Sequence, residues 1–100
     1  MTQRLRIDVS PRAFEDITGI RDYLVERSPQ GADNVRRAIN ATLEHLSQFP
    51  YTGRDRPELG VRSIGVARYS YTVYHRVHAD RVEIIHVRDD RRKPLEHGDV

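Results

Sequence analysis

The chain has no cysteine, a single lysine and no long run of apolar side chains. Without cysteine there can be no disulfide framework and no thiolate metal site, so a reducing compartment fits the composition. The first residues lack the apolar run of a signal peptide, and no stretch approaches the roughly 20 apolar residues of a membrane span. These absences predict a soluble cytoplasmic protein that does not contact a membrane.

Positive charge is concentrated in the second half of the chain. Residues 1–53 are electrically neutral, residues 54–94 carry a net charge of +4, and the remaining acidic residues bring the total to +2. An anionic partner should therefore meet the C-terminal half. A chain of 100 residues forms one domain. We place that domain at residues 1–94 and expect residues 95–100 to be a short, flexible acidic tail.

The first half of the chain predicts one strand and two helices. Residues 5–9 alternate apolar and polar side chains with the period of a strand. Ser10-Pro11 and Ser28-Pro29 each supply a capping hydroxyl and a proline suited to the first helical position, which predicts helices over about 11–27 and 29–48. Phe49 precedes a proline and is pushed out of the helical region. With almost no linker between them, the two helices should form a hairpin with one shared apolar seam.

The second half predicts three consecutive strands. Residues 50–60 are rich in turn formers and should form a loop, with strands following at about 61–66, 69–77 and 81–88. The tight connection at 78–80 predicts an antiparallel hairpin. The order β-α-α-β-β-β predicts an α+β fold, with the helical hairpin packed on one face of a mainly antiparallel sheet. The expected core comprises Phe14, Ile17, Leu24, Val35, Ile39, Leu43, Leu46, Val73 and Ile84.

Few side-chain patterns in this sequence point to chemistry. His75 and His86 should lie on adjacent strands, but no third ligand follows at a recognisable spacing, so neither a metal nor another cofactor is predicted. The sequence has no glycine-rich phosphate loop and no Gly-x-Ser-x-Gly elbow. Asp89 and Asp90 are flanked by arginines, which predicts a salt-bridged turn rather than an acid–base pair.

The most pronounced pattern is a set of arginines at the ends of the last three strands, interleaved with tyrosines. Cations beside aromatic faces can bind nucleic acid through phosphate contacts and base stacking. The alternative is a solvated rim of the sheet with tyrosines in the core, and composition leaves both interpretations open. The basic residues are Arg62, Arg68, Arg76, Arg88, Arg91, Arg92 and Lys93, and the tyrosines are Tyr69, Tyr71 and Tyr74.

From about residue 7 to residue 94, the chain resembles the RelE/ParE superfamily of toxins from bacterial type II toxin–antitoxin modules. The resemblance rests on the order of the elements and on six segments, namely Ser10-Pro11, Phe49-Pro50-Tyr51-Thr52-Gly53, Gly60-Val61-Arg62-Ser63, Arg68-Tyr69, Val73-Tyr74-His75-Arg76-Val77, and residues 82–88 leading into Arg91-Arg92. It implies a small growth-arresting toxin, associated with plasmid stabilization. A cognate antitoxin would hold it inactive in a hetero-oligomer. The sequence does not assign the residues that would bind the antitoxin.

Two activities occur in this superfamily. RelE-like toxins cleave messenger RNA on the ribosome without a metal, whereas ParE-like toxins inhibit DNA gyrase and perform no reaction of their own. By resemblance, a RelE-like site uses an arginine on the middle strand, a basic group after the last strand, and a tyrosine or histidine near the C-terminus. Tyr71 occupies the middle-strand position here, so a ribonuclease would have to use Arg92, Arg62 and His97.

This incomplete set favours the ParE-like branch, in which the protein is not an enzyme. Target engagement should then depend on an arginine edge made of Arg62, Arg68, Arg88, Arg91 and Arg92. If the RelE-like branch holds instead, the protein is a metal-independent, ribosome-dependent endoribonuclease. A third interpretation is a non-toxic module that only titrates antitoxin or autoregulates an operon, and the sequence leaves it open.

Overall fold

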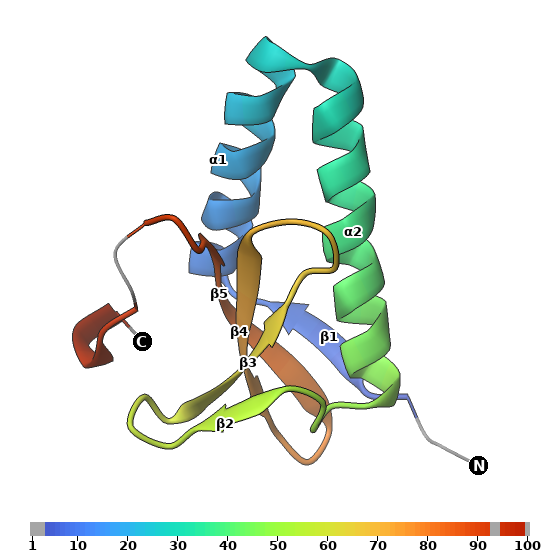
Figure 1. The fold of residues 1–100 in the computed structure, drawn as a ribbon. Coiled ribbons are helices and arrows are strands. Elements are labelled where there is room, and N and C mark those ends of the chain that lie inside the picture. Colours follow the sequence, from blue (N-terminus) through green and yellow to red (C-terminus); the bar gives the residue numbers. More distant parts are fainter. Residues whose placement is uncertain (1–3, 93–94, 100) are drawn as a thin grey trace.

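The computed structural model describes residues 4–92 and 95–99. Two helices form a hairpin that stands on one face of a sheet, with its tip extending beyond the strands (Figure 1). The α+β class and the helical hairpin predicted from the sequence are therefore confirmed. In chain order the elements are β1 (Arg6–Val9), α1 (Pro11–Arg27), α2 (Pro29–Gln48), β2 (Arg54–Arg56), β3 (Val61–Gly65), β4 (Tyr71–Val77), β5 (Arg81–Asp89) and the 3-10 helix η1 (His97–Asp99).

The serine–proline pairs set the helix boundaries as predicted. The Ser10 hydroxyl accepts a hydrogen bond from the Ala13 amide at 3.1 Å, and the Ser28 hydroxyl accepts one from the Gly31 amide at 3.0 Å. Ser28 is both the last cap of α1 and the first cap of α2. The two helices therefore reverse direction within one residue, and this keeps them side by side. No helix in the described part of the chain is long and apolar enough to cross a membrane.

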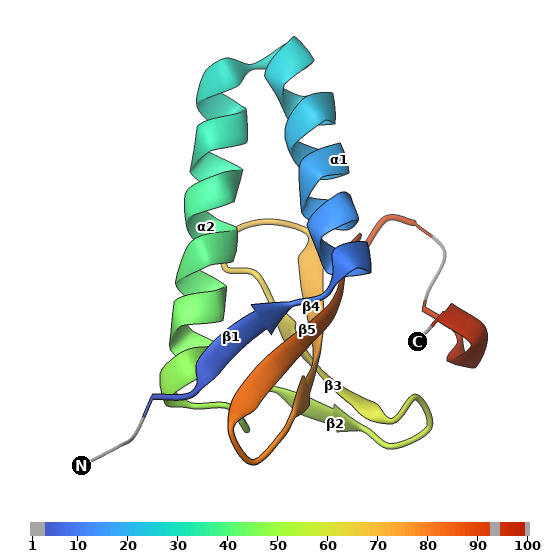
Figure 2. The same cartoon turned by 180° about the vertical axis from the view of Figure 1, so that it is seen from behind.

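The strands form one sheet in the order β1-β5-β4-β3-β2. β1 runs parallel to β5, and each of the other neighbouring pairs is antiparallel. Figure 2 shows β1 beside β5, with α1 beginning close to the C-terminal end of β5. The mainly antiparallel sheet predicted from the sequence is confirmed. β1 pairs with β5 only as far as Ile84, so the rest of β5 extends past the end of β1.

One element contradicts the sequence prediction. The sequence predicts a loop over residues 50–60, whereas the structure has the short edge strand β2 within that range. Its three residues are all charged, so no apolar alternation marks it as a strand. Gly53 turns the chain onto β3 with a φ of 99°, and a Cβ there would collide with the Ser63 carbonyl oxygen. Ladder hydrogen bonds to β3 define this strand, and its charges suit an exposed sheet edge.

The main core lies between the helical hairpin and the sheet. Ile39 and Leu46 of α2 pack there against Val73 of β4 and Ile84 of β5. Of the predicted core residues, Val35, Ile39, Leu46, Val73 and Ile84 are at most 5% exposed, while Ile17, Leu24 and Leu43 are half-buried and pack against the same cluster.

The prediction was wrong for Phe14, whose side chain is 66% exposed. Successive helical residues are rotated by about 100°, so Ala13, Ile17 and Leu24 point within an arc of about 40° toward the core. Phe14 points about 100° away from Ala13 and therefore faces solvent. Its proximity to the apolar stripe in sequence made it look like a core residue.

A second apolar cluster covers the opposite face of the sheet. Because successive strand residues point to opposite faces, Tyr74 and Ile85 face away from the helices. They pack with Leu59, Val61 and Leu95, and Leu95 is only 7% exposed. The tail that we expect to be flexible is therefore docked on the sheet in this structure. Its mobility in solution stays a prediction.

Candidate functional site

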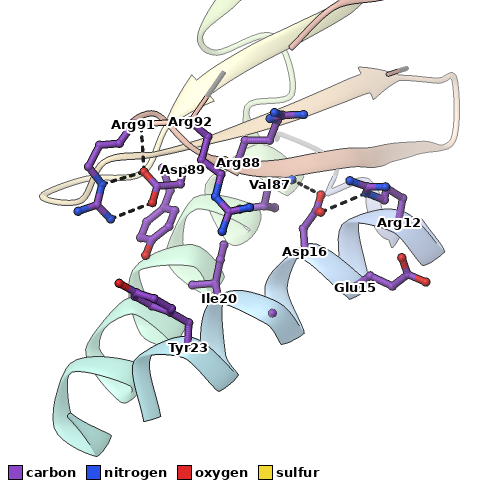
Figure 3. Close-up of a pocket in the computed structure, with 12 residues that line it drawn as sticks. Arg12, Glu15, Asp16, Ile20, Tyr23, Val87, Arg88, Asp89, Arg91 and Arg92 are labelled. Carbon is purple, nitrogen blue, oxygen red and sulfur yellow. Dashed lines mark hydrogen bonds and ion pairs between the residues drawn. The ribbon is translucent and has the colours of Figure 1, made fainter. Parts of the chain in front are cut away.

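A cleft of about 510 Å³ lies between α1 and the ends of β4 and β5 (Figure 3). The helix contributes one wall, and the last residues of β5 with the turn that follows contribute the other. The lining residues are Arg12, Glu15, Asp16, Gly19, Ile20 and Tyr23 from α1, Tyr71 from β4, and Val87, Arg88, Asp89, Arg91 and Arg92.

One stripe of α1 supplies the helical wall. Arg12, Asp16 and Tyr23 recur at helical spacing, on a line beside the core stripe of the same helix. Arg12 donates a hydrogen bond to Asp16 at 3.2 Å. Sequence reasoning missed this wall because apolar periodicity marks only the side that packs on the sheet. The signal available in the sequence was a second set of polar and aromatic residues with the same period.

Asp16 fastens α1 to the part of β5 that extends past β1. Its Oδ2 accepts hydrogen bonds from the Val87 amide at 3.1 Å and from Nδ1 of His86 at 3.0 Å. Ser10 makes a similar connection, because its amide donates to the Ile84 carbonyl at 3.0 Å and its hydroxyl to the Ile85 carbonyl at 3.2 Å. These hydrogen bonds take the place of the strand bonds that β1 would make to this part of β5, and they hold the two walls of the cleft together.

Arg91 is held by a two-point ion pair with Asp89. Its Nε and Nη2 lie 2.9 and 2.8 Å from the two carboxylate oxygens. The hydrogen bond from Arg91 holds the pKa of the Asp89 carboxyl below its ordinary value. Asp90, next in the chain, accepts a hydrogen bond from the Thr72 hydroxyl. The salt-bridged turn predicted at Asp89-Asp90 is therefore present.

Arg92 points into the cleft toward Ile20 (Figure 3). No ion pair joins it to another residue of the described chain. Tyr71 is 6% exposed, and burial raises the pKa of its phenol, with the Asp89 charge adding to the effect. Tyr71 is therefore a neutral hydrogen-bonding group at neutral pH. The cleft thus presents a guanidinium beside the phenols of Tyr71 and Tyr23.

The structure brings four of the five predicted arginines to one end of the sheet. Arg68 lies in the β3–β4 turn with a φ of 74°. This turn lies beside the β5 end, because the Asp90 amide donates to the Ser70 carbonyl at 2.8 Å. Arg88 points away from α1 in Figure 3 and pairs with Asp99 at 3.9 Å. Lys93 lies outside the described residues.

Arg62 lies at the other end of the sheet. β3 pairs it with His75, four residues from Tyr71 along β4, which corresponds to about 13 Å. Its Nη2 donates to the Tyr51 carbonyl at 2.8 Å, and its guanidinium lies 5.5 Å from the Tyr51 ring centre. Arg62 therefore fastens the segment after α2 onto the sheet.

The three residues required for the RelE-like alternative are not brought together. Arg62 pairs with His75 at one end of the β4 segment 71–75, whereas Arg92 follows Asp89, which pairs with Tyr71 at the other end. The backbone of His97 lies in η1, and its side chain is outside the described structure. Considering only the residues that the structure describes, no three His, Cys, Asp or Glu side chains could hold a metal ion.

Stability at acidic pH is expected to depend on His75. Its side chain is fully buried, with Nε2 3.3 Å from the Pro50 carbonyl. Burial lowers the pKa of the imidazole, and the charge of Arg62 acts in the same direction. The unfolded chain therefore takes up a proton near pH 6.5, whereas the folded protein does so only at lower pH. Stability should fall below about pH 6.5, by up to about 1.4 kcal/mol per pH unit from this group.

Urea unfolding at pH 7.5, 6.0 and 5.0 measures this effect in the wild type and in His75→Gln. The glutamine amide can still donate to the Pro50 carbonyl but does not titrate. Above pH 6.5 both states of the wild type are neutral at this position, so the two proteins should show the same pH dependence there. An equal loss of stability in both proteins at pH 5.0 would show that another group is responsible.

Comparisons with known proteins agree with the fold and with the order of the motifs. Residues 7–94 match the family described as "ParE toxin of type II toxin-antitoxin system, parDE". The chain is 32% identical over 84 residues to a protein of Caulobacter vibrioides named Toxin RelE3, and the match covers 82% of this chain and 90% of that protein. A solved structure described as "Chromosomal ParDE TA system from P. aeruginosa" has a similar fold, with a TM-score of 0.72 at 22% identity. That similarity covers 86% of this chain and 96% of the solved one.

Proposed function

We propose that this chain, which belongs to the ParE toxin family of type II toxin–antitoxin systems, arrests growth by binding DNA gyrase and catalyses no reaction of its own. Membership of the RelE/ParE superfamily makes it the toxin component of such a module, with an antitoxin as its partner. The separation of Arg62 from Arg92 is the observation that carries the choice of gyrase over messenger RNA.

Metal-free cleavage of RNA needs several side chains around one phosphate. One group must take a proton, another must give one, and a cation must stabilise the charge that develops on the phosphate. Arg62 is about 13 Å along the sheet from the Tyr71 end and is already bonded to the Tyr51 carbonyl. Tyr71 is buried and neutral. This geometry supports binding rather than catalysis.

The arginine-rich end of the sheet suits an anionic target. Arg68 lies on the neighbouring turn, and Arg91 and Arg92 follow β5. Arg91 is held in place by an ion pair with Asp89, whereas Arg92 forms no ion pair among the described residues, although its charge also acts on Asp89. A cation whose charge is not already neutralised can steer and hold an anionic surface. We therefore assign the leading role in target binding to Arg92.

The antitoxin is expected to cover the outward face of α1. Phe14 and Val25 are 66% and 45% exposed, and helical geometry places them within about 20° of each other around the helix. Large exposed apolar side chains of this kind mark protein interfaces. This surface lies apart from the cleft wall of the same helix, so an antitoxin that also blocks the arginine edge would have to reach around α1.

The second candidate function is cleavage of messenger RNA on the ribosome. The similarity to a protein named Toxin RelE3 favours it. A non-toxic module that binds antitoxin is the third candidate. Cytoplasmic location, expected from the sequence, stays a prediction that both toxic activities require.

Induction of the chain in bacterial cells tests the proposed function. Growth should stop, and plasmid recovered from the cells should be more relaxed than before induction. Co-expression of the cognate antitoxin should restore both growth and supercoiling. Arrest with normal supercoiling would contradict the gyrase assignment. Unimpaired growth with abundant folded protein would favour the non-toxic module.

A further inference from the structure

The C-terminal segment carries a polar contact that the proposed function does not use. Leu95 packs on the outer face of the sheet against Val61, Tyr74 and Ile85. Within the segment, the Glu96 amide donates to the Asp99 carboxylate at 2.9 Å, and the Asp99 amide donates to the Glu96 carbonyl at 2.9 Å. Residues 95–99, hereafter the strap, are therefore a compact turn that covers an apolar surface.

His86 connects this strap to the domain. Its ring is 3% exposed and lies between two acceptors, with Nδ1 3.0 Å from the Asp16 carboxylate and Nε2 against the main-chain carbonyl of Asp99. A neutral imidazole carries one N–H and can donate to only one of these groups. The protonated ring carries two and can donate to both.

Charged groups surround this ring. Asp16 on α1 shares its other oxygen with Arg12, and the Asp99 carboxylate lies 3.9 Å from Arg88 of β5. Among the described residues, the Tyr74 phenol lies on β4, which pairs Tyr74 with His86 across the sheet, and Glu96 lies in the strap. When the ring is neutral, its single proton should stay on Nδ1, because a hydrogen bond to a carboxylate is stronger than one to a carbonyl. The bare Nε2 would then face the Asp99 carbonyl oxygen, which repels it.

We propose that the strap is a proton-controlled cover, docked on the outer face of the sheet while His86 is charged and released when His86 is neutral. Release exposes the apolar surface formed by Leu59, Val61, Tyr74 and Ile85. The proposal does not depend on whether the target of the toxin is gyrase or the ribosome.

A single spin label measures the position of the strap, because the native chain has no cysteine to compete for labelling. Gly98→Cys is a suitable position, since a Cβ there meets nothing within 4 Å. The label should be mostly immobilised at pH 5.5 and mostly mobile at pH 8.5. The ratio of docked to released strap should fall at least about tenfold, as expected for loss of one charge-assisted hydrogen bond.

Three variants in the Gly98→Cys background separate this mechanism from its alternatives. His86→Gln should remove the pH dependence, Leu95→Ala should leave the label mobile at both pH values, and His75→Gln, at the other buried histidine, should leave the pH dependence intact. If the label on Gly98→Cys alone, with no second substitution, is equally mobile at pH 5.5 and 8.5, the proposal is overturned even if His86→Gln does not fold. Persistence of the pH dependence in folded His86→Gln would also overturn it.

Discussion

Arg92→Gln is expected to weaken gyrase inhibition at least about tenfold while leaving the stability of the domain unchanged. A charge-assisted hydrogen bond contributes about 1.5–3 kcal/mol, and each 1.4 kcal/mol is a tenfold change in affinity. Arg92 points into the cleft and forms no ion pair with another described residue, so its removal breaks no internal contact of that kind. The concentration that halves DNA supercoiling measures the effect, and thermal unfolding checks the fold.

Two matched variants sharpen this experiment. Arg91→Gln should have a smaller effect, because the Asp89 carboxylate already neutralises Arg91 at 2.8 Å. Arg37→Gln removes the same charge from α2, where Arg37 pairs with Asp33 on an exposed surface, and it should leave inhibition unchanged. If Arg92→Gln inhibits gyrase as well as the wild type does, the arginine edge is not the target-binding surface.

Leu46→Ala is expected to lower the free energy of unfolding by about 2–5 kcal/mol. Leu46 is completely buried between α2 and the sheet, so truncation removes apolar contacts and leaves a cavity. Leu43→Ala, one turn earlier on the same helix, should cost less because Leu43 is only half-buried. Urea unfolding followed by circular dichroism compares the two. Equal losses would contradict the packing of α2 described here.

Local signals in the sequence were sufficient to predict the helices and the class of fold. A serine hydroxyl and a proline ring act on their immediate neighbours, so the starts of α1 and α2 could be predicted from residues 10–11 and 28–29 alone. The strand β2 could not be predicted in this way, because ladder hydrogen bonds to residues 61–63 define it. Phe14 shows a related limit. A periodic pattern does not decide which of two adjacent apolar residues, Ala13 or Phe14, faces the core.

The cleft depends on contacts between residues far apart in the sequence. Asp16 accepts a hydrogen bond from the Val87 amide, 71 positions away in the sequence. No local pattern predicts which residue of α1 bonds the part of β5 that has no β1 partner. The arginine edge was predicted as one group because all five arginines occur within or next to the last three strands. Strand register decides which of them meet, and it places Arg62 at the end of the sheet away from Arg91 and Arg92.

The two proposed targets can be distinguished in one pair of reactions with the same purified protein. It is added to DNA gyrase acting on relaxed plasmid, and separately to ribosomes translating a defined messenger RNA. We predict that supercoiling falls and cleaved DNA accumulates in the first reaction, while the messenger in the second stays intact. Codon-specific cuts in the ribosomal A site, with unchanged gyrase activity and loss of cutting in Arg92→Ala, would contradict the account and assign the protein to the ribonuclease branch.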